Sequence, residues 1–227
     1  MKQQIKQAVS ALLQETFPYI KRKFSNTSTL YETFIDQNYK WLCANLKPDT
    51  VAIDIGANIG DSAIYLAMHN EIKKVIAFEP FPSLYSQAME NVKRAGFSDK
   101  VQLNNKGVGG AKNKIHIPKG YTADVYSSAA RYKKRSDNEG IEITTLDDLL
   151  GSIKSKNIII KCDCEGDEER IFNGHNKLGN VYKMQIEYHG GPKDLPDRIR
   201  KQGFKVELER VEEDLRRGEC GWIYASR

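Results

Sequence analysis

The stretch that decides the fold is VAIDIGANIGDSAIYL, which runs from Val51 to Leu66. It starts as a short apolar strand, passes through an acid and two glycines, and continues with apolar residues at helical spacing. Glycines between a strand and a helix permit a tight turn and let the backbone come close to a ligand. The stretch therefore predicts a strand, a ligand-binding turn and a helix in direct succession.

The same alternation of strands and helices extends outward from this stretch. Further apolar strands are predicted at 74–80, 101–105, 157–164 and 181–189, with helical patterns between them. Parallel strands joined by helical crossovers form a sheet that helices cover on both faces. The closing segments FKVELER and CGWIYASR are predicted to pair as an antiparallel hairpin. The sequence thus predicts an α/β fold, a three-layer α/β/α sandwich with a mainly parallel sheet and an antiparallel C-terminal end.

The chain is predicted to consist of an N-terminal helical extension, residues 1–48, and one domain, residues 49–227. Within the extension, LYETFIDQNYKWLCANL (30–46) is predicted to be helical because its large apolar residues fall near one face. Near the C-terminus, KDLPDRIRKQG (193–203) is also predicted to be helical, although Pro196 is expected to interfere.

An insert of about residues 112–140 departs from the regular alternation. KIHIP (114–118) alternates like an exposed strand, and the polar stretch from Tyr126 to Arg135 has no core-forming period. The basic residues of that stretch form either a solvated loop or a lid over an anionic substrate. After the insert, IEITTLDDLL (141–150) is predicted to be a strand and a short helix, with Thr144 or Thr145 as the N-cap.

The amino-acid composition limits the classes of protein to which this chain can belong. The 227 residues carry a formal net charge of +5, which is compatible with an anionic substrate or RNA and demands neither. No apolar stretch reaches the roughly 20 residues of a membrane span, and the N-terminus lacks the apolar core of a secretory signal. The four cysteines form no metal-binding cluster, so reduced thiols are expected. We expect a cytoplasmic monomer or homodimer.

The glycine turn favours one nucleotide-type cofactor over another. A nicotinamide site has the pattern G-x-G-x-x-G, whereas here Asn58 and Asp61 stand in place of the second and third glycines. Asp54 would repel a pyrophosphate but favours the cationic sulfonium and amino group of S-adenosylmethionine (SAM). Glu79, at the end of the next strand, can accept hydrogen bonds from ribose hydroxyls in either kind of site. The alternative is that Asp54 and Glu79 are only solvated strand ends.

Acids and a histidine are predicted at the same edge of the sheet. Asp163 and Glu165 follow the strand at 157–164, and Glu187 and His189 end the strand at 181–189. A neutral histidine is a natural general base near pH 7. These four residues could instead hold Mg²⁺ or Ca²⁺, although nothing in their spacing requires a metal.

Asp167 and Glu168 follow in the same segment. Acids at the first turn of a helix complement its dipole, and this structural role is the one we expect for both residues.

Several segments together resemble the FkbM-type SAM-dependent methyltransferase family. They are DIGANIGDSAIYLA, VIAFEPFPSLYSQAMENV, ITTLDDLL, IIIKCDCEGDEERIFNG and IEYH, which occur in the family's order over roughly residues 50–190. The match departs at Cys162 and Cys164, where such proteins usually carry apolar residues. Cysteine packs as a small hydrophobe, so the expected fold is unaffected.

The resemblance implies a Rossmann-like class I methyltransferase fold that binds SAM. Asp54 and the turn would surround the amino acid end of SAM, Glu79 would hold the ribose, and the loop from Asn105 to Val108 would lie near the adenine. The cofactor residues expected on this pattern are Asp54, Gly56, Ala57, Asn58, Gly60, Asp61, Ser62, Glu79, Pro80, Asn105 and Gly107.

The activity that the resemblance implies is O-methylation of a hydroxyl on a sugar, glycan or other small metabolite. Asp163, Glu165, Glu187 and His189 are the expected catalytic residues. An RNA methyltransferase is the alternative, but nucleic acid is not the expected partner because no RNA-binding module is recognisable. A non-catalytic SAM-binding protein and a dehydrogenase are the remaining hypotheses.

Overall fold

The structure is a computed structural model that describes residues 32–34, 36–117, 134–135, 140–173, 178–214 and 218–227. The predictions for residues 1–31 and for Tyr126 to Lys133 lie outside these ranges.

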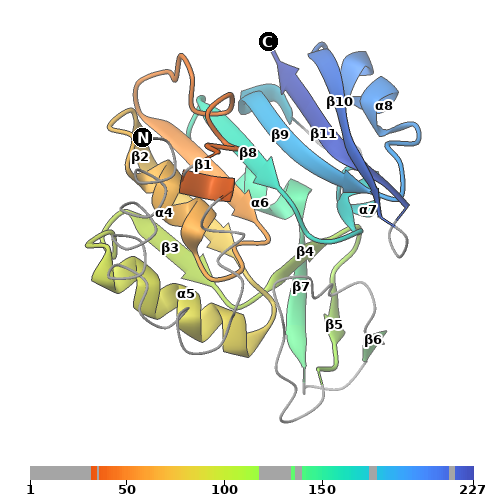
Figure 1. The fold of residues 1–227 in the computed structure, drawn as a ribbon. Coiled ribbons are helices and arrows are strands. Elements are labelled where there is room, and N and C mark those ends of the chain that lie inside the picture. Colours follow the sequence, from red (N-terminus) through yellow and green to blue (C-terminus); the bar gives the residue numbers. More distant parts are fainter. Residues whose placement is uncertain (1–31, 35, 118–133, 136–139, 174–177, 215–217) are drawn as a thin grey trace, which may run out of the picture.

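The centre of the molecule is a seven-stranded sheet in the order β10-β11-β9-β8-β1-β2-β3 (Figure 1). Its strands are β1 (Thr50–Ile55), β2 (Ile72–Phe78), β3 (Val101–Asn104), β8 (Ile158–Cys162), β9 (Val181–His189), β10 (Lys205–Asp214) and β11 (Gly218–Ser226). The five strands from β9 to β3 are parallel, and β11 pairs antiparallel with both β9 and β10. The predicted mainly parallel sheet with an antiparallel C-terminal end is confirmed.

Helices cover both faces of this sheet. Every residue of β1 and β8 is buried, as expected for parallel strands between two helical layers. Alternate residues enter opposite cores: Ala52 packs with α4 (Asp61–Ala67) and α5 (Pro82–Arg94), whereas Ile53 packs with α6 (Leu146–Ser152), α7 (Glu168–Ile171) and α8 (Leu195–Lys201). Cys162 is fully buried in the second core, and all four cysteines are free thiols.

Local signals set the ends of the helices. Thr145 caps α6, because its hydroxyl oxygen accepts a hydrogen bond from the Asp148 N–H at 3.3 Å. Pro196 lies in the first turn of α8 and does not interfere with it. The expected interference is wrong because the N–H groups of a first turn have no partner within the helix, so proline removes nothing there.

A second, four-stranded sheet is formed by the chain around the predicted insert. Its order is β4-β7-β5-β6, with β4 (Gly107–Gly109), β5 (Asn113–Ile115), β6 (Lys134–Arg135) and β7 (Ile141–Thr145). It lies at the end of the main sheet toward which the arrows of β1 and β8 point (Figure 1). The sequence pattern indicated β5 and β7, but it placed part of β4 in a loop.

The segment before β1 is not the continuous helix that was predicted for residues 30–46. Of the described residues in this range, 32–34 are helical, and turns follow as far as Asn45. Gln37 and Asn45 have φ values of 55° and 53°, which are incompatible with a right-handed helix. The segment is nevertheless anchored to the sheet, because Lys183 donates hydrogen bonds to the carbonyls of Trp41 and Ala44. In the part of the chain that the structure describes, no helix has the length and apolarity to cross a membrane.

Candidate functional site

The glycine turn between β1 and α4 is held against the ends of two neighbouring strands. The N–H groups of Gly56 and Ala57 donate to the carbonyl of Phe78 at 3.1 and 2.9 Å, which ties the turn to β2. Gly56 has a φ of 78°, and a Cβ atom on it would lie 1.8 Å from the carbonyl oxygen of Asp163. The turn therefore touches the backbone that follows β8, and only glycine fits at this contact.

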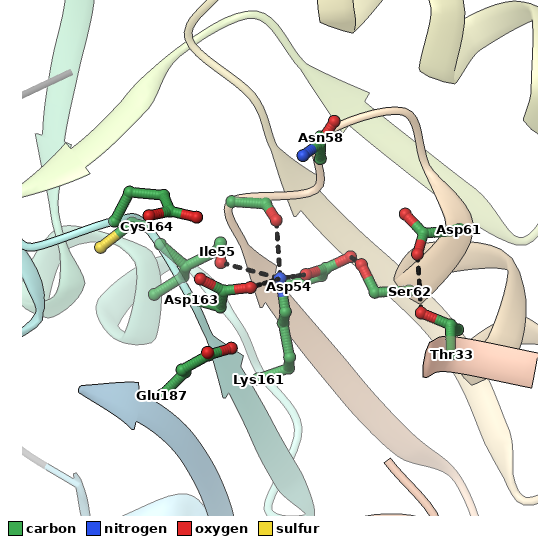
Figure 2. Close-up of polar contacts among 12 residues, drawn as sticks. Thr33, Asp54, Ile55, Asn58, Asp61, Ser62, Lys161, Asp163, Cys164 and Glu187 are labelled. Carbon is green, nitrogen blue, oxygen red and sulfur yellow. Dashed lines mark hydrogen bonds and ion pairs between the residues drawn. The ribbon is translucent and has the colours of Figure 1, made fainter. Parts of the chain in front are cut away.

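A buried ion pair lies directly behind the turn. Asp54 is fully buried, accepts a hydrogen bond from the Ser62 hydroxyl at 2.7 Å, and lies 3.3 Å from the Lys161 ammonium (Figure 2). Lys161 also donates to the Gly56 carbonyl at 2.6 Å and lies 4.0 Å from Asp163. Lys161 thus links β8, the turn and Asp163. Sequence reasoning assigned it no role, although a lysine within an apolar strand beside acids was a signal.

The charge of this ion pair is maintained by its surroundings. Burial acts to lower the pKa of Lys161, but the nearby carboxylates, chiefly Asp54 and also Asp163, outweigh burial and raise the pKa well above its ordinary value. Lys161 is therefore an ammonium at neutral pH. We expected Asp54 to favour the cation of SAM. In the structure, the cation beside Asp54 is the Lys161 ammonium of the protein itself.

Glu79 forms the opposite side of the turn. Its carboxylate accepts hydrogen bonds from the N–H groups of Asn58 and Phe81, both at 2.9 Å. Burial raises the pKa of Glu79 to about 8, although these two donors act in the opposite direction. Glu79 is therefore held in place by the backbone and is largely protonated at pH 7.

A cavity lies between Glu79 and the chain that follows β8, and it encloses about 580 Å³, open solvent included. The predicted residues that line it are Gly56, Asn58, Glu79, Pro80, Gly107, Asp163 and Glu165; the other lining residues are Ile55, Phe78, Phe81, Leu84, Val108, Cys164 and Asp167. The structure therefore brings residues from β1, β2 and β4, and from the chain that follows β8, to one cavity.

The remaining predicted cofactor residues form a layer outside this lining: Asp54, Ala57, Gly60, Asp61, Ser62 and Asn105. Asn105 donates to the carbonyls of Glu79 and Pro80 at 2.9 and 3.0 Å. Asp61 accepts a hydrogen bond from Thr33 at 2.6 Å, and burial raises its pKa to about 6. These side chains support the turn and the strand ends rather than line the cavity.

The predicted catalytic residues cluster at the ends of β8 and β9. His189 Nε2 lies 3.6 Å from Glu165 and 3.9 Å from Glu187, and Figure 2 shows the Glu187 carboxylate directed toward Asp163. Asp163 and Glu165 line the cavity, whereas Glu187 and His189 lie outside its lining. Burial, together with the charge of Asp163, raises the pKa of Glu187 well above its ordinary value.

Glu168 is the second residue that sequence reasoning missed. It is buried, and one of its carboxylate oxygens accepts hydrogen bonds from the N–H groups of Cys164 and Gly166, both at 3.1 Å. The same oxygen lies 3.1 Å from His189 Nδ1. Glu168 therefore holds the turn after β8 and orients His189, beyond the helix-dipole role that its position predicted.

This contact sets the charge of His189. Burial acts to lower the pKa of His189, but its hydrogen bond and charge interaction with Glu168 outweigh burial and raise the pKa to about 9. An imidazolium at neutral pH cannot accept a proton, so the expected neutral general base is not what this geometry favours. Ligand atoms of Asp163, Glu168 and His189 lie within 4.8 Å of one another. The metal site suggested from the sequence, Asp163, Glu165, Glu187 and His189, shares two residues with this group and does not contain Glu168.

The contact with Glu168 predicts a pH dependence of stability. Because the folded-state pKa of His189 is raised from 6.5 to about 9, its contribution is fully present below pH 6.5 and is lost as the pH rises through 9. We expect this contribution to reach about 3 kcal/mol, the equivalent of this pKa shift. Urea unfolding of the wild type and His189→Gln at pH 6.5 and 9.5 measures it. The contribution is refuted if the difference between the two proteins is the same at both pH values.

Together, the parallel sheet, the glycine turn and the acids at the strand ends define a Rossmann-like methyltransferase fold. The model of the methyltransferase FkbM domain matches residues 54–206. The chain therefore belongs to the FkbM family of methyltransferases, which confirms the resemblance seen in the sequence.

Two relatives are each 24% identical to this chain. AMB antimetabolite synthetase AmbE of Pseudomonas aeruginosa aligns with 78% of the chain, which spans only about 10% of that much longer protein. Methyltransferase 1 of Beauveria bassiana aligns with 79% of the chain and 81% of its own length.

Solved structures share the fold at low sequence identity. TrmK of M. capricolum, bound to S-adenosylhomocysteine, has a TM-score of 0.53 and 11% identity over 83% of this chain and 67% of its own. The precorrin 8W decarboxylase of Methanobacterium thermoautotrophicum has a TM-score of 0.52 and 15% identity over 86% and 90%. Sp1610 of Streptococcus pneumoniae, in complex with SAM, has a TM-score of 0.51 and 15% identity over 84% and 72%.

Proposed function

We propose that this protein is a SAM-dependent O-methyltransferase that acts on a hydroxyl of a sugar, glycan or other small metabolite. The observation that carries the proposal is the cavity, which has Glu79 on one wall and Asp163 with Glu165 on the other. One wall has the group that a ribose requires, and the other has carboxylates that can receive the proton of a hydroxyl.

The residues of the cavity fit SAM. Glu79 would accept hydrogen bonds from the ribose hydroxyls, the turn at Gly56 would hold the amino acid end, and Gly107 with Val108 would flank the adenine. Gly107 is also closely packed on its other side, because an added Cβ would meet the Ile143 side chain at 2.4 Å. When bound, SAM would supply a methyl group activated by its sulfonium: the acceptor oxygen bonds to the methyl carbon, the bond from that carbon to sulfur breaks, and the neutral thioether S-adenosylhomocysteine leaves.

We assign the general base to Asp163. Its side chain is 26% exposed, lines the cavity and lies 4.0 Å from Lys161, whose positive charge keeps the carboxylate oriented. As the hydroxyl oxygen bonds to the methyl carbon, the hydroxyl proton passes to the Asp163 carboxylate. His189 is a positioning residue in this assignment, because its imidazolium lies between Glu168 and Glu165.

Calorimetric titration tests the proposal. At about pH 8, where an appreciable share of Glu79 is a carboxylate, we expect S-adenosylhomocysteine to bind with micromolar affinity and NAD⁺ not to bind. Glu79→Ala should weaken binding at least about tenfold, because a lost hydrogen bond to a charged group is worth roughly 1.5–3 kcal/mol. Glu142→Ala is the matched control, since Glu142 is exposed and pairs with Lys106 at the surface. Binding of NAD⁺ in place of S-adenosylhomocysteine would refute the proposal.

The same titration should depend on pH. Because ribose hydroxyls donate to a carboxylate, the ligand selects the deprotonated form of Glu79, whose pKa is about 8 in the free protein. Affinity should therefore increase between pH 6.5 and 8, by up to about tenfold per pH unit. Glu79→Gln should reduce this slope; an unchanged slope would assign the proton to another group.

The RNA alternative receives support from the fold alone. Lysine and arginine that contact phosphates dominate the affinity of proteins for nucleic acid. Among the described residues that line the cavity there is no lysine or arginine. Retention on RNA with a steep salt dependence would reverse this assessment.

A further inference from the structure

The acceptor side of the cavity carries a surplus of negative charge. Asp163, Glu165 and Asp167 all line it, and the Glu187 carboxylate points toward Asp163 from the neighbouring strand (Figure 2). No lysine or arginine is among the described lining residues, and the cations that pair with these acids lie outside the lining: Arg170 with Asp167 at 3.3 Å, His189 with Glu165 at 3.6 Å and Lys161 with Asp163 at 4.0 Å. Carboxylates accept hydrogen bonds and attract cations, whereas they repel phosphates and carboxylates on a ligand.

The two buried cations beside this cluster are already engaged within the protein. Lys161 donates to the Gly56 carbonyl and pairs with Asp54 behind the turn. The ring of His189 lies between Glu168 on one side and Glu165 with Glu187 on the other. These contacts direct both positive groups toward the acids of the protein, so neither is presented to an anionic ligand.

Glu187 shares its cation with two other acids. Among the described residues the group that pairs with it is the His189 ring, whose Nε2 lies 3.9 Å away but closer to Glu165 and whose Nδ1 contacts Glu168, and the Glu187 side chain is 28% exposed. A carboxylate that is largely withdrawn from water, and that faces a second carboxylate, gains from a cation placed between them.

We propose that the acceptor is a hydroxyl compound that bears an ammonium group, which binds at Glu187 and Glu165 while Asp163 faces the hydroxyl. Acceptors with a phosphate or carboxylate beside the hydroxyl are rejected. This inference rests on the proposed function and identifies the substrate class of the same site.

The test uses the protein saturated with S-adenosylhomocysteine. That ligand keeps the amino group of SAM, so any place for the cofactor's own ammonium is already filled. Three matched probes are then titrated at pH 6.5 and followed by ligand-observed NMR: 2-amino-2-deoxyglucose, glucose and glucose 6-phosphate. We expect the amino sugar to bind at least about tenfold more tightly than glucose, and the phosphate to show no binding.

Two variants locate the effect. Glu187→Gln should reduce the preference for the amino sugar over glucose to less than about threefold. Glu169→Gln changes the same charge on the exposed side of α7, where Glu169 pairs with Lys193, and should leave the preference intact. Circular dichroism and titration with S-adenosylhomocysteine establish that each variant is folded.

The outcomes separate the two proposals. If S-adenosylhomocysteine does not bind, the proposed function fails. If it binds but the amino sugar is held no more tightly than glucose, or none of the probes binds, the inference about the acceptor is overturned. Binding of glucose 6-phosphate would also overturn it and would favour an anionic acceptor. If Glu169→Gln lost the preference to the same extent, the preference would reflect the overall charge of the protein rather than a contact with Glu187, and the inference would be overturned.

Discussion

Replacing Lys161 with methionine should destabilise the protein by about 3–5 kcal/mol, the usual cost of removing one partner of a buried ion pair. The ammonium is 2% exposed and lies 3.3 Å from Asp54, which is completely buried. Methionine fills a similar volume but leaves the Asp54 carboxylate with only the Ser62 hydroxyl as a donor among the contacts described. The Gly56 carbonyl would also lose the hydrogen bond that anchors the turn. Urea unfolding measures the loss, and binding of S-adenosylhomocysteine should decline with it.

Two further variants separate charge from packing. Lys106→Met removes a lysine that pairs with Glu142 at the surface, and it should change stability by less than about 1 kcal/mol. Asp54→Asn combined with Lys161→Met removes both charges and should recover part of the loss. A loss below about 1 kcal/mol in Lys161→Met alone would show that the buried pair contributes little.

Alanine at Gly56 should prevent the native fold or abolish cofactor binding. Its methyl group would lie 1.8 Å from the Asp163 carbonyl oxygen, and the next nearest atoms also belong to the backbone. No side chain can move to relieve the contact, so the turn and the chain after β8 would have to separate. Such a separation would displace Asp163 from the cavity. Soluble yield, circular dichroism and titration with S-adenosylhomocysteine measure the outcome.

Gly96→Ala is the matched control for this substitution. Gly96 has a φ of 79°, almost the same as that of Gly56, but an added Cβ would have no atom within 4 Å. It therefore carries the backbone strain of a left-handed residue, roughly 1–2 kcal/mol, without the clash. If both variants lose the same stability, the contact with Asp163 is not what requires glycine at position 56.

The features that could be predicted from the sequence are those that local patterns encode. The run of buried residues in β1, the glycines that follow it and the acid that ends the next strand lie within short stretches, and their spacing alone indicates the turn. The order of the strand types then indicates the sheet. The effect of Pro196 is also a local one, but the prediction for it was wrong. A proline disturbs a helix when it lies beyond the first turn, and Pro196 lies in the first turn of α8.

The missed residues depend on which strands become neighbours. Asp54 and Lys161 are 107 positions apart and become direct partners in the ladder of β1 and β8. Glu168 contacts His189 only because β9 lies beside β8. Strand β4 has three small residues and acquires its partner, β7, from beyond the insert. Neither a period nor a motif within a single stretch encodes these pairings.

The aromatic packing of the segment before β1 has a spectroscopic consequence. The chain has two tryptophans, and both lie where this segment meets β11: Trp41 packs on Tyr224 at 5.0 Å, and Trp222 meets Tyr39 edge to face at 6.2 Å. Tyr39 in turn lies 5.9 Å from the Lys161 ammonium. Intrinsic fluorescence excited at the indole band is therefore a local reporter of this junction. An emission change that precedes the loss of circular dichroism during unfolding would record release of the segment before the sheet opens.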